Sequence, residues 1–560
     1  MPDALADALL VTIVMLPAAT ALLLVGSGLV LGFLGLPALP ERGWRMVGIA
    51  ASTLTFLLAF GVLALGFDPE RIGFQHVEFF GWPGTYGAHL LLGVDGIGLC
   101  FLVVTSGLVP LAMLCSEPER REGTRSWVAT CLLLESGLLG GLASINLMSF
   151  VFFWAASLLP ALLWLGRWGG IGRARAASRV WTTEAIGLAG LLFVAFVLRE
   201  ASLDQLGVAT LDLAATADRI APLASAGDGA TQPISLLDVR LGAADQTLLF
   251  LVLVVSLAMR LPLAPFHFWL PAAHASSPTG LSILLATGYV QTAAVGILRF
   301  ALPLFPDAAR DIGPALSLVG IGALVYASLI ALVQKELKRL VAYTSIGYAG
   351  FAVFGISTLN VQGLTGAVVQ ILTHGLATAA LFMLIGFLAV RRGTTEVGAF
   401  GGLAKPMPVC AFFFAVMVLS LVGLPLLGGF VGDLFVLLGS LETRRELSGV
   451  ALVAMVVAAS YLLWVQRRLF LGPVDEPANR GLIDLDRVER GVLLAITIPI
   501  VFIGVYPNPV LRRVEPAVLE ILSQMERDVL PAQPEEPGEV GEGVELVERR
   551  AARDGGGTER

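Results

Sequence analysis

Long hydrophobic runs alternate with short polar segments along almost the whole chain. Each run is about 20 residues long, the length at which a helix crosses the hydrocarbon core of a bilayer. The pattern predicts an all-α, polytopic membrane protein with about fourteen transmembrane helices. Their approximate bounds are 8–35, 45–67, 92–115, 127–146, 147–165, 180–198, 246–265, 279–303, 314–334, 339–358, 362–390, 408–438, 448–470 and 490–507.

Basic residues indicate how these spans are oriented. Loops that follow odd-numbered spans hold most of the arginines and lysines, whereas loops that follow even-numbered spans hold few. Because basic loops stay in the cytoplasm, both termini are expected on the opposite side. The polar segment 200–245 is expected outside the membrane, and residues 514–560 are expected to begin as an amphipathic helix and continue as an acidic, disordered tail.

Two of the predicted spans are interrupted by proline. The seventh breaks at Pro262 and Pro265, and the twelfth breaks at Pro425 within "VGLPLLGGFVGD". Proline removes a backbone donor, and a broken helix persists in a membrane only where protein or water satisfies its backbone. The breaks lie five spans apart and therefore in opposite topologies, which predicts an inverted repeat. A kink that merely assists packing is the alternative.

This repeat suggests five regions. They are 1–126 with the first three spans, 127–303 with spans four to eight, 304–471 with spans nine to thirteen, 472–513 with the last span, and 514–560 as the acidic tail.

Composition narrows the chemistry that these spans can carry. Hydrophobic residues make up 56% of the 560 residues and charged residues 14%, against roughly 25% charged residues in soluble domains. The four cysteines lie singly in apolar runs, which argues against an iron–sulfur or zinc site. No basic patch indicates nucleic acid, and no glycine-rich nucleotide loop is present. We therefore expect no cofactor or metal in this chain.

A few ionisable residues fall inside the spans, where they are costly and point to function. They are Glu135, Glu184, Arg260, His374 and Asp433. One such group per helix is typical of proton or ion transfer rather than of binding a large solute. Structural alternatives remain open: a hydrogen-bonded neutral carboxyl, a first-turn helix acid at Glu184, or a satisfied histidine. His267 and His274 are expected near the cytoplasmic edge, as interface or fold-locking groups.

Several motifs resemble the antiporter-like membrane subunits of respiratory complex I, and most closely the M type. They are "LLLGVDGIG", "APFHFWLPAAHASSPTGLSILLATGYVQTAAVGILRF", "LVQKELKRLVAYTSIGYAGFAVFGI", "GLTGAVVQILTHGLATAALFMLIGFLAVRR" and "FGGLAKPMP". The resemblance covers about residues 90–470. The histidine of "LTHG" favours the M type over the L and N types.

The resemblance implies a proton-translocating subunit of the membrane arm of an NADH–quinone oxidoreductase, in the bacterial inner membrane. Its partners would be the L-type and N-type chains and the lipid bilayer, and other subunits would bind NADH and quinone. Protons would move through half-channels at the two broken helices, along a path through Glu135, Glu184, Arg260, Gln291, Tyr348, His374 and Asp433.

Four positions depart from the family pattern. Ala155 replaces a glutamate, Arg260 and Gln291 replace lysines, and Tyr348 replaces a histidine. Arginine keeps its proton in proteins and glutamine has none to give. Arg260 is expected to pair with Glu135 or Glu184, the latter standing in for the missing glutamate.

Three hypotheses follow from these departures. The chain pumps protons by an altered path, or it is a non-pumping structural and coupling subunit. In the third, it belongs to another assembly with the same module, namely a cation/proton antiporter, a hydrogenase or a carbon-dioxide-hydrating complex.

Overall fold

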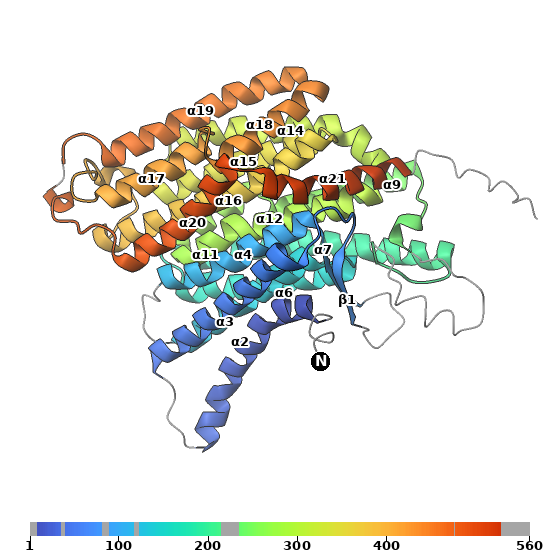
Figure 1. The fold of residues 1–560 in the computed structure, drawn as a ribbon, viewed down its shortest axis with the longest axis horizontal. Coiled ribbons are helices and arrows are strands. Elements are labelled where there is room, and N and C mark those ends of the chain that lie inside the picture. The colour runs from blue at the N-terminus through green and yellow to red at the C-terminus, as the bar shows by residue number, and fades with distance from the viewer. Residues whose placement is uncertain are drawn as a thin grey trace, which may run out of the picture.

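The computed structural model describes residues 8–34, 40–80, 89–116, 123–213, 235–474 and 477–527. Within these ranges, 13 helices are long and apolar enough to cross a membrane. They lie side by side in one bundle (Figure 1). The predicted all-α membrane architecture is confirmed. The tail beyond residue 527 and much of the predicted polar segment, residues 214–234, lie outside the described residues.

The helices follow the predicted order closely. Those of the N-terminal half are α2 (Leu9–Leu34), α3 (Glu41–Gly61) with the π-helical turn η1 (Val62–Gly66), α4 (Gly96–Cys115), α5 (Thr124–Ala143), α6 (Leu147–Trp168), α7 (Arg173–Leu206), the 3-10 turn η3 (Leu236–Asp238) and α9 (Ala243–Arg260). The eighth span, Thr279–Leu304, combines α11 (Thr279–Leu284), η5 (Leu285–Tyr289), α12 (Val290–Gly296), η6 (Ile297–Ala301) and α13 (Leu302–Leu304).

The C-terminal half contains the remaining helices. They are α14 (Pro306–Leu332), α15 (Leu337–Ile356), α16 (Val361–Arg392), the short turn η7 (Val397–Ala399), α17 (Pro408–Leu421), α18 (Gly428–Thr443), α19 (Arg445–Phe470), the short turn η8 (Pro477–Asn479), α20 (Arg487–Val505) and α21 (Asn508–Arg527).

Both predicted helix breaks are present. Helix α9 ends at Arg260, and the chain continues through η4 (Phe266–Trp269) into α10 (Leu270–Ser276). Helix α17 ends at Leu421 and α18 begins at Gly428. The predicted twelfth span is therefore two short helices, which is why it is not among the 13 long ones.

A short hairpin was not predicted. Strand β1 (Gln75–Phe80) pairs antiparallel with β2 (Leu90–Val94), directly before α4. Helix α4 begins at Gly96, where the Asp95 carboxylate accepts a hydrogen bond from the Gly98 amide at 2.6 Å. The sequence placed the start of this span at residue 92, because hydrophobicity alone does not separate an apolar strand from the helix that follows it.

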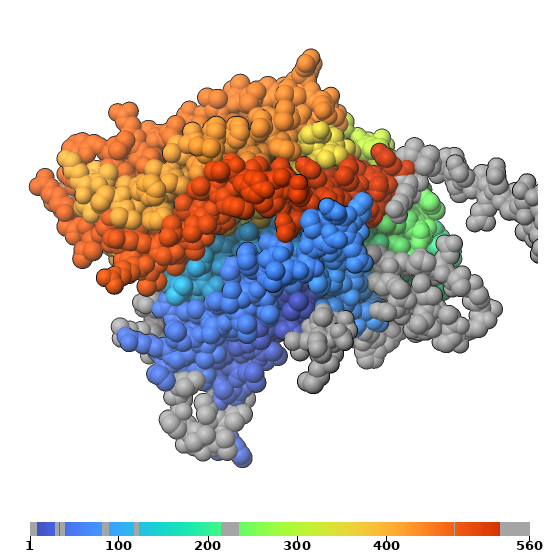
Figure 2. Space-filling view, in the orientation of Figure 1, coloured from blue at the N-terminus to red at the C-terminus, as the bar shows by residue number. Residues whose placement is uncertain are grey.

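The C-terminal amphipathic segment is one continuous helix across the expected boundary at residue 513. Helix α21 packs against α16 and α4, and it crosses the bundle between the N-terminal helices and the second half of the chain (Figure 1). In the space-filling view this C-terminal segment separates the blue N-terminal surface from the orange surface of the later helices (Figure 2). It therefore joins the two halves of the bundle.

Helix α16 forms the centre of the second half. Every residue in the most apolar 18-residue stretch of this helix is buried. Gly366 on α16 and Gly432 on α18 let the two backbones meet, because a Cβ at Gly432 would lie 2.6 Å from the Gln370 backbone. Close helix contacts in membranes depend on such small residues.

We expect Gly432→Val to push α18 away from α16 and to lower the free energy of unfolding by about 1–3 kcal/mol, as overpacking does. Thermal unfolding of the purified protein measures the effect. Gly449→Val on α19 is the matched control, because among the described residues no atom lies within 4 Å of a Cβ there. Equal melting temperatures of the two variants would contradict the packing argument.

Candidate functional site

Arg260 and Glu184 form a fully buried ion pair where α9 ends. Both side chains are 0% exposed. The Arg260 Nη2 and Nε atoms lie 2.6 Å and 2.9 Å from Glu184 Oε2. Nη1 also donates to the Ser157 hydroxyl at 3.1 Å, and Nη2 to the Trp154 carbonyl at 3.1 Å. Every nitrogen of the guanidinium therefore has a protein acceptor.

Two aromatic rings complete the surroundings of Arg260. Its guanidinium carbon lies 3.5 Å from the ring centre of Trp154 and 4.4 Å from that of Tyr289. Cation–π contacts add to the stabilisation of a desolvated guanidinium. The arrangement holds a permanent positive charge in a fixed position, since arginine keeps its proton in proteins.

Glu184 does not lie in the first turn of its helix, which was one interpretation of the sequence. Helix α7 begins at Arg173 rather than near residue 180. Glu184 therefore lies in the fourth turn and not in the first turn, so it is not a partner of the helix dipole. It pairs with Arg260 through Oε2, and its second oxygen, Oε1, is buried without a hydrogen-bond partner among the described residues.

Glu135 lies on α5 and is not the partner of Arg260. Its Oε1 accepts a hydrogen bond from the Ser52 hydroxyl of α3 at 2.9 Å. Its Oε2 is buried and has no hydrogen-bond partner in the described part of the chain. One carboxyl oxygen is therefore bound to a neighbouring helix while the other is available to water.

Gln291 lies in α12, in the middle of the eighth span. Its Oε1 accepts a hydrogen bond from the Thr105 hydroxyl of α4 at 2.6 Å. Its Nε2 is buried and has no acceptor within the described residues. Gln291 can therefore orient a water molecule, but it cannot itself accept and release a proton.

A second polar group surrounds the break between α17 and α18. A cavity there is lined by Tyr348, Gln370, Thr373, His374, Ser420, Leu421, Gly429 and Asp433. The Tyr348 and His374 rings stack with their centres 4.7 Å apart, and the Tyr348 hydroxyl donates to the Leu421 carbonyl. Among the described residues, both ring nitrogens of His374 and the Oδ2 atom of Asp433 lack hydrogen-bond partners.

The cavity differs from the Arg260–Glu184 pair in which atoms lack partners. At the pair only Glu184 Oε1 does so, while every guanidinium nitrogen is bonded; at the cavity two imidazole nitrogens and a carboxyl oxygen do so, among the described residues. Buried polar atoms without protein partners normally bind water. A carboxyl and an imidazole that share a hydrated cavity can pass a proton between them. The cavity can therefore exchange protons, whereas the Arg260 guanidinium cannot.

The two histidines beside the first break lie at different depths in the protein. His274 is fully buried and stacks on Phe382 at 4.4 Å. His267 lies at the surface of the bundle, with its Nε2 atom 3.3 Å from the Tyr326 hydroxyl. Neither contacts the Arg260–Glu184 pair directly in the hydrogen bonds described.

The sequence did not predict the pair of Arg299 with Asp95, which is 14% exposed. Their side chains meet at 3.0 Å, and Arg299 is 3% exposed. The signal that could have found it is the one that marks Arg260, namely a charged residue within a long apolar run.

We expect Glu184→Gln to lower the free energy of unfolding by about 3–5 kcal/mol, because Arg260 would keep a buried charge without its counter-ion. Thermal unfolding of the purified protein in detergent measures the loss. Glu200→Gln, on the same helix, removes one charged partner of Arg199 at a partly exposed site and should cost less than about 1 kcal/mol. A Glu184→Gln variant as stable as Glu200→Gln would contradict this account.

The sequence of this chain is similar to those of a known protein family. Residues 144–462 match the family described as NADH:quinone oxidoreductase/Mrp antiporter, TM. The NADH-quinone oxidoreductase subunit M of Rhodobacter capsulatus is 33% identical over 489 residues, covering 87% of this chain and 92% of that protein. Subunit M of Mycobacterium tuberculosis strain ATCC 25618 / H37Rv is 31% identical over 514 residues, covering 86% and 90%.

Solved structures agree in fold. A chain of respiratory complex I from Thermus thermophilus with bound NADH superposes with a TM-score of 0.78 at 28% identity, covering 92% of this chain and 99% of that chain. A chain of the Mrp complex from Dietzia sp. DQ12-45-1b gives 0.74 at 18% identity, covering 94% and 100%, and shares the fold. The chain therefore belongs to the NADH:quinone oxidoreductase/Mrp antiporter family of membrane subunits.

Proposed function

We propose that this integral protein of the bacterial inner membrane is the M-type, proton-translocating subunit in the membrane arm of an NADH–quinone oxidoreductase. Electron transfer from NADH to quinone takes place in other subunits, and its energy moves protons through this one. The observation that carries the proposal is the cavity at the α17–α18 break. There, Asp433, His374 and Tyr348 meet in the interior of a bundle of membrane-spanning helices.

In this proposal the two broken helices have different roles. At the first break, Arg260 and Glu184 supply a fixed pair of charges that responds to electrostatic changes elsewhere in the complex. At the second break, the Asp433 carboxyl takes up a proton and releases it, with His374 and Tyr348 beside it. Glu135 is a further proton-accepting group on α5.

Gln291 lies on the span whose Tyr289 contacts Arg260, and its Nε2 would lie 3.6 Å from a Cβ at Gly375, the residue after His374. Its free amide can bind a water molecule that carries the proton, since its own side chain cannot. The proton path would then use water at the point where relatives are expected to use lysine.

The remaining features of the proposal follow from the same assignment. The partners are the L-type and N-type subunits of the membrane arm, and other subunits hold NADH, quinone and the redox centres. In this proposal residues 127–303 and 304–471 are the two inverted halves; the presence of one broken helix in each supports the division. Residues 1–126 precede them, and 472–513 contain the last span.

A non-pumping coupling subunit is the second candidate. Two observations favour it. Every nitrogen of the Arg260 guanidinium already has a protein acceptor, and the residue in the middle of the eighth span is Gln291, which cannot carry a proton. A cation/proton antiporter, a hydrogenase or a carbon-dioxide-hydrating complex would use the same fold. The fold alone does not separate these assemblies, whereas the identity to subunit M favours the oxidoreductase.

We expect Asp433→Asn to lower the number of protons moved per electron pair while NADH–quinone electron transfer in the assembled complex continues. Proton uptake by membrane vesicles during NADH oxidation measures this ratio. Glu442→Gln, on the exposed end of the same helix, is the matched control and should leave the ratio unchanged. The proposal fails if Asp433→Asn and Glu135→Gln both pump normally.

We expect Arg260→Lys to alter both stability and pumping. An ammonium cannot bond Glu184, Ser157 and the Trp154 carbonyl in the same fork geometry, and loss of such bonds costs about 1–3 kcal/mol. A buried lysine can also lose its proton, so the fixed charge becomes exchangeable. Arg391→Lys is the control, because it breaks a similar fork with Glu489 at the end of α16; it should lower stability but leave the proton ratio unchanged. An Arg260→Lys complex with unchanged melting temperature and unchanged proton ratio would refute the fixed-charge role.

A further inference from the structure

A second buried arginine lies near the end of the eighth span that the distribution of basic residues predicts to face away from the cytoplasm. Arg299, in η6, is 3% exposed and its Nη2 lies 3.0 Å from the Asp95 carboxylate. Its Nη1 donates to the carbonyls of Leu142 at 2.9 Å and Ser144 at 2.7 Å, at the end of α5. Its Nε is buried and has no hydrogen-bond partner among the described residues.

A small cavity lies beside this pair. Asp95, Arg299 and Phe74 line one side, and Glu520 and Gln524 of α21 line the other. Two carboxylates and one guanidinium therefore meet around a single space. An ion pair that served only to fasten α4 to the eighth span would need neither the second carboxylate nor the space between them.

Helix α21 is fastened over the cavity at both ends. Near its start, Arg513 donates to the Leu63 carbonyl at 3.0 Å. Near its end, the Met525 carbonyl accepts a hydrogen bond from Arg310. These contacts place Glu520 against the cavity, so α21 forms its outer wall.

The "LLLGVDGIG" motif makes room for this arrangement. A Cβ at Gly98 would lie 2.6 Å from Arg299 Nη2 and 2.9 Å from Asp95 Oδ1. A Cβ at Gly96 would lie 1.6 Å from the Arg513 carbonyl oxygen of α21. Gly98 thus permits close approach by the guanidinium, and Gly96 permits close approach by the helix that covers it.

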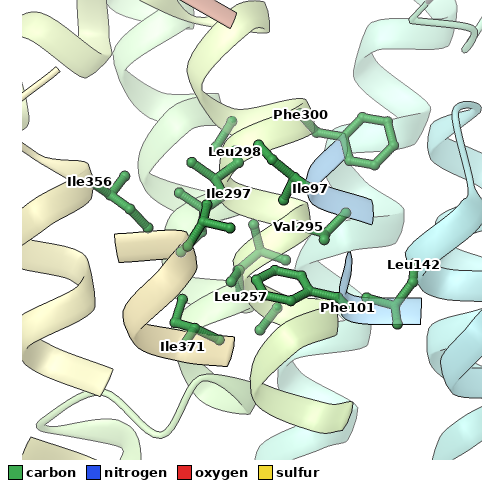
Figure 3. Packing of buried hydrophobic residues seen from close by; sticks show 14 of the residues in the cluster. Ile97, Phe101, Leu142, Leu257, Val295, Ile297, Leu298, Phe300, Ile356 and Ile371 are labelled. Carbon is green, nitrogen blue, oxygen red and sulfur yellow. The ribbon is translucent and has the colours of Figure 1, made fainter. Parts of the chain in front are cut away.

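An apolar layer separates the cavity from the middle of the membrane. Gln291 and Arg299 are eight residues apart on the eighth span, or about 12 Å of helix. Val295 lies between them on that span, and it belongs with Phe101 and Leu142 to one buried hydrophobic cluster (Figure 3). All three side chains are almost completely buried. A proton can cross this layer only when water enters it.

We propose that the cavity between Asp95, Arg299 and Glu520 is the site where this subunit exchanges protons with the non-cytoplasmic water. The carboxyls of Asp95 and Glu520 hold the proton, and the positive charge of Arg299 favours its release. The layer around Val295 prevents backflow while it is dry. The inference rests on the proposed function and adds a second exchange site, distinct from the cavity at Asp433.

The test uses the assembled complex in membrane vesicles and compares Asp95→Asn, Glu520→Gln and Asp433→Asn. Asparagine preserves the helix cap at position 95 and removes only the charge. We expect both Asp95→Asn and Glu520→Gln to lower the number of protons moved per electron pair, with electron transfer retained. Asp95→Glu should restore part of the ratio. Asp486→Asn is the matched control, because Asp486 caps α20 as Asp95 caps α4, by accepting a hydrogen bond from the amide three residues further on.

The outcomes separate the two proposals. A normal ratio in Glu520→Gln and in Asp95→Asn, with a reduced ratio in Asp433→Asn, overturns the exchange site and leaves the proposed function intact. A normal ratio in all three variants overturns both. If Asp95→Asn does not assemble, Glu520→Gln decides, because its side chain lies on the covering helix and bonds only Gln524 of that helix in the side-chain hydrogen bonds described.

Discussion

A charge that is buried in a membrane protein needs a counter-charge and acceptors for its N–H groups. Arg260 imposes this requirement on the first half of the bundle. Its acceptors come from α6 and α7, and the ring of Tyr289 from the eighth span closes over it. The end of α9 is therefore held at a fixed position among its neighbours. The helix break follows immediately after this anchored residue.

The second half of the bundle is built in the opposite way. Around Asp433 several polar atoms have no hydrogen-bond partner in the described part of the chain, and a cavity lies beside them. Packing is tight nearby, since Gly432 brings α18 onto α16. The cavity therefore results from the interruption of a helix and not from loose packing. The first half fixes the position of the Arg260 charge, whereas the second half provides a cavity in which Asp433 can bind and release a proton.

Much of the fold was predictable because membrane helices are long and apolar. The breaks were predictable because proline marks them. The partner of Arg260 could not be predicted, because the choice between Glu135 and Glu184 depends on which face of α7 packs against α9. Asp95 and Arg299 are 204 positions apart in the sequence, and a single sequence does not show that such distant residues are in contact. The hairpin was missed because an apolar strand leads directly into an apolar helix.

The central claim is that the proton moves at Asp433 and not at Arg260. Redox-induced infrared difference spectroscopy of the assembled complex tests it directly, because a carboxyl that gains or loses a proton changes its C=O stretching band. The account predicts a carboxyl band during turnover that disappears in Asp433→Asn and persists in Glu442→Gln. A band that persists unchanged in Asp433→Asn would contradict the account.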